Sequence, residues 1–96
     1  MAAKLNKRSI QGWLEAHAGW SRKANELAKE YRFASFRDSI VFVNRVAGLA
    51  DAADHHPDIE IHFDRVLITL STHSAGGITE KDLQLAERLD HATSAG

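Results

Sequence analysis

The sequence lacks cysteine, any excess of one charge sign and any long apolar run. The absence of cysteine excludes disulfide bonds, thiolate metal sites and a cysteine nucleophile. Because 12 lysine and arginine residues are balanced by 13 acidic ones, no broad basic field exists to hold nucleic acid or an anionic membrane. No segment is long enough to cross a bilayer, and the first residues lack the apolar core of a signal peptide. We therefore expect a cytoplasmic protein without nucleic-acid or membrane partners.

Length and composition predict one globular domain. The chain has 96 residues, of which 44% are hydrophobic and 26% charged, which is ordinary globular usage. Dividing so short a chain would leave neither part enough residues to bury a core. The expected domain spans residues 1–96.

Three segments have the apolar spacing of helices, each behind a residue suited to cap its first turn. Within the longest of them the apolar positions form two rows that together cover about half the circumference at 100° per residue, which is wider than packing on one sheet requires. We therefore expect a second subunit to bury part of this helix in a homo-oligomer. The predicted helices cover about residues 7–17 behind Asn6, 36–54 behind Ser35, and a last segment opened by Thr79 and Asp82 as a capping box.

Two segments predict a β-hairpin, and one segment is ambiguous. Residues 59–63 alternate as a half-buried strand, and residues 66–72 are rich in β-branched side chains. The short Asp64-Arg65 link favours a hairpin between them. Residues 20–33 combine helix-forming residues with a strand-like parity of apolar positions, so periodicity alone does not decide their structure.

Histidine is the one unusual count, with six in so short a chain. His55 and His56 stand where the long helix stops before Pro57, and His73 follows the last predicted strand. If these elements meet, two or three imidazoles would surround one cavity, and imidazole can both give and take a proton near neutral pH. Asp51 lies four residues before His55, close enough on a helix to orient its ring.

Two other interpretations of these histidines remain. A histidine at a helix end is often a surface residue that interacts with the helix dipole. Clustered imidazoles can also bind zinc, but adjacent histidines cannot easily bind one metal from a regular helix, and no HExxH or CxxC spacing is present. The sequence therefore predicts no metal site.

The spacing of the polar residues resembles a known family. Asp51, His55-His56-Pro57, Phe63, His73 and Asp82 together resemble the signature of the pterin-4a-carbinolamine dehydratases, and the similarity runs from about residue 5 to residue 89. The resemblance implies an α+β fold of order α-β-β-α-β-β-α, in which helices pack on one face of a four-stranded antiparallel sheet. It also implies that residues 20–33 form a hairpin and that the chain assembles into dimers or tetramers.

The resemblance implies a hydro-lyase that needs no cofactor. Its members remove water from 4a-hydroxytetrahydropterin, a product of aromatic amino acid hydroxylases, to give a quinonoid dihydropterin. The partners implied are thus a pterin substrate and a functional link to such a hydroxylase. His56 and His73 are the expected acid and base, and His55 is expected to position substrate or to share in proton transfer. The implied substrate-binding residues are Asp51, Trp20, Ser71, Thr72 and Asp82.

A non-catalytic function is the alternative. Some relatives serve as dimerisation cofactors of a transcription factor, and related domains that have lost the catalytic histidines assist assembly of a carboxysomal enzyme. All three histidines are present here, which favours the enzyme.

Overall fold

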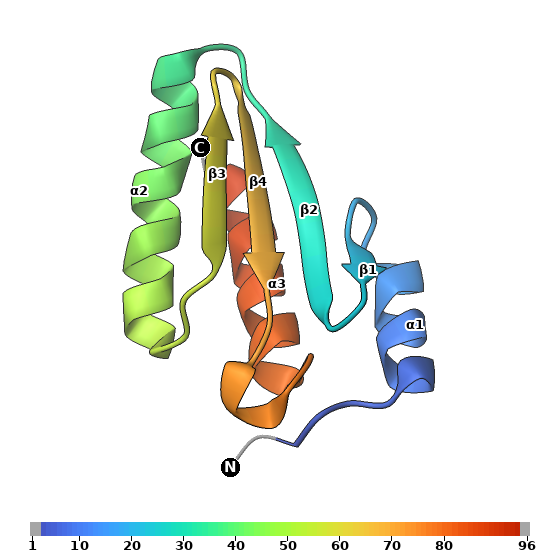
Figure 1. The fold of residues 1–96 in the computed structure, drawn as a ribbon. Helices are drawn as coiled ribbons and strands as arrows, with labels where there is room; N and C mark the ends of the chain where they lie inside the picture. Colours follow the sequence, from blue (N-terminus) through green and yellow to red (C-terminus); the bar gives the residue numbers. More distant parts are fainter. Residues whose placement is uncertain (1–2, 95–96) are drawn as a thin grey trace.

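The computed structural model describes residues 3–94 as three helices and one four-stranded sheet (Figure 1). The order of elements confirms the predicted α-β-β-α-β-β-α arrangement, and the hairpin at residues 20–33 is present. The elements are α1 (Lys7–Ala16), β1 (Ser21–Lys23), β2 (Glu26–Arg32), α2 (Phe36–Ala53), β3 (Asp58–His62), β4 (Arg65–Leu70), the short 3-10 helix η1 (His73–Ala75) and α3 (Glu80–Ser94).

The strands are all antiparallel and lie in the order β1-β2-β4-β3. Leu27 of β2 pairs with Leu70 of β4, and Ile59 of β3 pairs with Ile68 of β4. As a result β2 and β3 begin, and β4 ends, at the end of the sheet where α2 also ends (Figure 1). This shared end carries the three predicted histidines.

The core lies between the helices and one face of the sheet. Burial alternates along β4, where Val66, Ile68 and Leu70 are buried and the residues between them are half-exposed. The same alternation explains the first hairpin, because Leu27 and Tyr31 of β2 both enter this core. Burying these two side chains against β4 and the helices outweighs the helical propensity of the segment.

The predicted helix caps are confirmed. The Asn6 side chain accepts a hydrogen bond from the Ser9 N–H at 2.8 Å. Ser35 Oγ likewise accepts from the Asp38 N–H at 3.1 Å. At α3 the Asp82 carboxylate accepts from the Thr79 N–H at 2.9 Å, which is the reciprocal bond of a capping box.

The turn of the second hairpin lies one residue earlier than predicted. It consists of Phe63 and Asp64, whereas Arg65 belongs to β4 and pairs with His62. Phe63 has a φ of +54°, a left-handed conformation that is unusual for a bulky residue. Its side chain is 69% exposed. The prediction of Asp64-Arg65 as the link was therefore wrong, since no glycine or asparagine marks this turn.

Some large apolar side chains stay exposed at the end of the molecule opposite the histidines. Phe36 begins α2 and Phe63 lies in the β3–β4 turn, and these two segments meet at that end (Figure 1). Val41 and Ile61 are also at least 40% exposed.

Within residues 3–94, no helix has the length and apolar character to span a membrane.

Candidate acid–base site

The end of α2 directs the two adjacent histidines differently. The helix ends at Ala53, and Asp54 takes a left-handed conformation with φ 50° and ψ 43°. The His55 N–H then closes the helix by donating to Ala50 O at 3.1 Å. Because the chain leaves the helical path at Asp54, positions after it no longer follow helical spacing.

His55 is held by a carboxylate from another helix. Its Nε2 lies 2.5 Å from Asp82 Oδ1 of α3, and the two side chains are 11% and 0% exposed. The expected pairing of Asp51 with His55 is therefore wrong. That pairing assumed four-residue spacing along a continuous helix, and the left-handed Asp54 removes it.

A chain of hydrogen bonds surrounds Asp82. Its Oδ2 accepts from the Thr72 hydroxyl at 2.8 Å and from the Thr79 N–H at 2.9 Å. Thr72 has one hydroxyl hydrogen, so when it donates to the Asp82 carboxylate, Thr79 is the donor in the 2.8 Å contact between the two threonine hydroxyls. Thr79 Oγ1 in turn accepts from the Lys81 N–H at 3.3 Å. Every hydrogen in this chain thus points toward the buried carboxylate.

His56 pairs with Asp51 at the surface. His56 Nε2 lies 2.9 Å from Asp51 Oδ1, but the side chains are 60% and 77% exposed. Solvent screens such a pair, so it restrains the imidazole only weakly. His56 therefore remains open to solvent, in contrast to His55.

His73 begins η1, two residues after the end of β4, and is exposed. Its side chain lines a cavity of about 350 Å³ at the ends of β2 and β4. The cavity is also bordered by Ser71, Thr72 and the Gly76-Gly77 loop, by Ala24 and Asn25 of the β1–β2 turn, and by Glu26 at the start of β2. The sequence-predicted residues Ser71, Thr72 and His73 thus lie together in one cavity.

His55 lines a different cavity from His73 in the single chain. That cavity, of about 170 Å³, lies between the end of α2 and the start of α3, and Lys81 and Arg88 also border it. Hydrogen bonds link the two cavities, because Thr72 borders the His73 cavity and donates to the carboxylate that holds His55.

Trp20 lies away from His55, His56 and His73. It is 6% exposed, and its Nε1 donates to Asp90 Oδ2 at 3.0 Å. Asp90 follows Asp82 by eight residues on α3, which is about 12 Å along the helix axis. The structure therefore places the Trp20 indole in the core beside the first hairpin.

The Asp90 carboxylate accepts hydrogen bonds from three side chains, of which Trp20 is one. The Lys29 ammonium donates to Oδ1 at 2.7 Å and the Tyr31 hydroxyl to the same oxygen at 2.6 Å. Burial alone would raise the pKa of Asp90, but the hydrogen bonds from Lys29, Tyr31 and Trp20 outweigh it and hold that pKa below its usual value. Burial, reinforced by Asp90, raises the pKa of Tyr31 far above its usual value.

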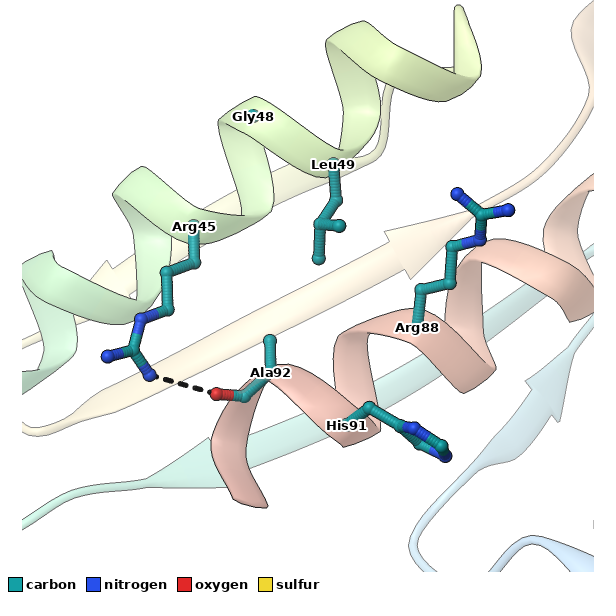
Figure 2. Close-up of a pocket in the computed structure, with 6 residues that line it drawn as sticks. All are labelled: Arg45, Gly48, Leu49, Arg88, His91 and Ala92. Atoms are coloured by element: carbon teal, nitrogen blue, oxygen red, sulfur yellow. Dashed lines mark hydrogen bonds between the residues drawn. The ribbon is translucent and has the colours of Figure 1, made fainter. Parts of the chain in front are cut away.

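A larger cavity, of about 640 Å³, lies between α2 and α3 and contains none of the predicted site residues (Figure 2). Arg45 crosses its rim and donates to Ala92 O at 3.0 Å, while Gly48, Leu49, Arg88 and His91 complete the lining. It offers no carboxylate beside an imidazole, so it lacks the acid–base pairing seen at the ends of α2 and β4.

Neither pair of histidine and carboxylate forms a metal centre. Across residues 3–94, no three histidine, cysteine, aspartate or glutamate side chains converge as a ligand set would. His55 and His56 each have a carboxylate of their own, from α3 and α2 respectively. Each of the two imidazoles is thus held by one carboxylate.

Sequence reasoning missed several residues that border the site. Thr79 was expected only to cap α3, yet its hydroxyl also supports Thr72. Asn25 and Glu26 border the His73 cavity because Leu27 pairs with Leu70, which brings the start of β2 beside the end of β4. Only the strand register could have revealed them, and local patterns did not determine it.

Fold and site together define a small α+β domain that places carboxylate-held imidazoles at one end of an antiparallel sheet. Residues 3–92 match the sequence profile of the family described as pterin 4 alpha carbinolamine dehydratase. The chain belongs to this family.

Individual relatives agree with this assignment. A protein of Thermomicrobium roseum named "Putative pterin-4-alpha-carbinolamine dehydratase" is 47% identical, over 96% of this chain and 99% of its own. A crystal structure described as a transcriptional coactivator/pterin dehydratase from Brucella melitensis superposes with a TM-score of 0.89 at 28% identity, covering 93% and 97% of the two chains. A pterin dehydratase-like protein, described as a RuBisCO assembly factor in the alpha-carboxysome, gives 0.66 at 28% identity, covering 79% and 90%.

Proposed function

We propose that the protein dehydrates 4a-hydroxytetrahydropterins to quinonoid dihydropterins. The observation that carries the proposal is the buried Asp82–His55 pair. Asp82 also accepts a hydrogen bond from Thr72, which borders the cavity that His73 lines. Family membership supplies the substrate class. The cavity of about 350 Å³ has room for a bicyclic ring of this kind.

The reaction needs two proton transfers and no change of oxidation state. The bond from C4a to its hydroxyl oxygen breaks, a proton reaches the departing oxygen to form water, and a ring N–H loses a proton as the quinonoid system forms. Positioned imidazoles perform both transfers near neutral pH, because their charged and neutral forms are both populated there.

His56 and His73 are the proposed acid and base, and His55 positions substrate or assists a transfer. His56 and His73 are exposed, so a substrate can reach both rings. The backbone at Ser71 and Thr72 is the proposed pterin contact, because the Thr72 hydroxyl is already committed to Asp82. Asp82 is fully buried and acts through His55, whereas Asp51 acts through His56.

Stopped-flow measurement of carbinolamine decay tests the proposal. A phenylalanine hydroxylase generates the carbinolamine, and its absorbance is followed with and without this protein after subtraction of the spontaneous rate. We expect a clear acceleration that falls about 10-fold or more in His56→Ala and in His73→Ala. Decay at the spontaneous rate with the folded wild-type protein would refute the proposal.

His62→Ala is the matched control. His62 is also an exposed histidine beside a carboxylate, with its Nε2 3.2 Å from Glu60 Oε1, but it lies at the far end of β3. Its loss should leave the dehydration rate nearly unchanged. Full activity in both site variants together with an inactive His62→Ala would place the reaction elsewhere on the sheet.

A non-catalytic assembly role is the second candidate, because of the likeness to the carboxysomal assembly factor and the exposed apolar side chains around Phe36 and Phe63. This role requires no proton transfer. A protein without dehydratase activity in the stopped-flow assay would favour it.

A further inference from the structure

We infer that Thr72 and Thr79 are positioning residues that keep Asp82 ionised and thereby fix the hydrogen of His55 on Nε2, so that Nδ1 is the nitrogen of His55 that exchanges protons. The assignment of a role to His55 in catalysis rests on the proposed function. The assignment of its hydrogen rests on the hydrogen-bond chain alone.

The burial of Asp82 makes its donors decisive. The side chain is 0% exposed, and an ionised carboxylate without partners would be strongly disfavoured there. Three donors compensate for the lost water: the Thr72 hydroxyl, the Thr79 N–H and the His55 ring. Asp82 also lies in the first turn of α3, where the helix dipole favours negative charge.

Both threonine hydroxyls are oriented by this arrangement. Lys81 N–H donates to Thr79, Thr79 to Thr72, and Thr72 to Asp82. A protonated Asp82 would instead need an acceptor for its own hydrogen. On Oδ2 its hydrogen could go only to Thr72, which would then have to turn and donate to Thr79, and the Thr79 hydroxyl, which already accepts from the Lys81 N–H, would lose Thr72 as the acceptor of its own hydrogen. On Oδ1 the hydrogen would reverse the bond to His55. The chain therefore favours the ionised carboxylate, which can only accept from His55 Nε2.

The consequence for His55 is a fixed division between its two nitrogens. With Nε2 donating to Asp82, a neutral ring has its lone pair on Nδ1, and protonation converts Nδ1 alone. The charged groups around the ring are Asp82, together with Lys81 and Arg88 of the cavity that His55 lines. Loss of one hydroxyl from the chain would let Asp82 take up a proton and donate it to Nε2, which would move the hydrogen of His55 to Nδ1.

Nitrogen-15 spectra of the imidazoles test this assignment directly. In the wild-type protein, with His55 assigned by its absence in His55→Gln, we expect Nδ1 to lose its proton as the pH rises while Nε2 keeps its hydrogen. In Thr72→Val, which removes the hydroxyl at nearly constant shape, we expect the two nitrogen signals to move toward each other or exchange. Thr72→Ser restores the hydroxyl and should restore the wild-type pattern.

Activity of the same variants separates this inference from the proposed function. We expect the dehydration rate to fall about 10-fold in Thr72→Val and to recover in Thr72→Ser. If Thr72→Val does not fold, Thr79→Val compared with Thr79→Ser carries the same test, together with the wild-type spectrum.

Two results would overturn the inference: a wild-type His55 that carries its hydrogen on Nδ1, or hydroxyl-free variants with an unchanged nitrogen pattern. The predicted pattern in a protein without dehydratase activity would support the inference while refuting the proposed function.

Discussion

Removal of the Asp90 carboxylate tests how much its hydrogen bonds between the first hairpin and α3 stabilise the protein. In Asp90→Ala, the Trp20 indole N–H and the Tyr31 hydroxyl lose their acceptor, and both residues are only 6% exposed. Each buried donor left without a partner costs about 1–3 kcal/mol, whereas the longer Lys29 chain can turn to solvent. We expect the free energy of unfolding to fall by about 2–6 kcal/mol in total.

Urea and thermal unfolding followed by circular dichroism measure this change, at one protein concentration because association shifts the apparent stability. For a domain of this size the melting temperature should fall by at least about 8 °C. Glu87→Ala is the matched control, since Glu87 is on the same helix and accepts from Trp13 but is 49% exposed. A loss below about 1 kcal/mol in Asp90→Ala would refute the argument that the two buried donors depend on this carboxylate.

The difference in stability between wild type and Asp90→Ala should also depend on pH. The pKa of Asp90 is lower in the folded protein than its ordinary value of 3.8, so the unfolded chain binds more protons around that pH. The stabilisation by Asp90 is therefore present above about pH 4 and is lost as the pH falls through the folded pKa. The difference in urea midpoint between wild type and Asp90→Ala should shrink on acidification, and a difference that grows would contradict this sign.

Two further outcomes are expected. Large apolar side chains are exposed at Phe36, Val41, Ile61 and Phe63, so light scattering should give a particle mass that is a multiple of 10.6 kDa. Phe63→Asp should lower this mass, and a wild-type particle of 10.6 kDa at micromolar concentration would contradict the prediction. Elemental analysis should find no stoichiometric zinc or iron in the purified protein, whereas one metal per chain that is lost together with activity on chelation would indicate metal-assisted dehydration.

Local signals in the sequence predicted what local interactions determine. The caps Asn6, Ser35 and Thr79 fix the starts of the three helices through hydrogen bonds that span two or three residues, so residue type and spacing suffice to find them. The structure of residues 20–33 depends on the pairing of β2 with β4, about forty residues away. Propensity could not determine it, and the family resemblance did.

In the candidate site, too, local patterns predicted some features and missed those that depend on contacts between elements. The positions of His55, His56 and His73 at the ends of elements could be predicted, but the partner of His55 could not. Asp82 lies 27 residues away on another helix. Aspartate tolerates a left-handed backbone, but the sequence does not mark Asp54 as the residue that adopts it and so separates His55 from Asp51. Pairings that cross between elements depend on packing, which periodicity within one element does not report.

The two carboxylate–imidazole pairs differ in how firmly they hold their histidines. Asp51 and His56 are largely exposed, so water competes for the hydrogen bond between them and the ring can turn. Asp82 and His55 are buried, so the bond between them has no competitor and the carboxylate is fixed from its other side by Thr72 and Thr79. In the proposed dehydration, the mobile imidazole would exchange protons with water between turnovers, and the fixed one would keep a constant orientation toward the substrate. The burial of one pair and the exposure of the other, more than the number of histidines, thus distinguish the roles that we propose for the two imidazoles.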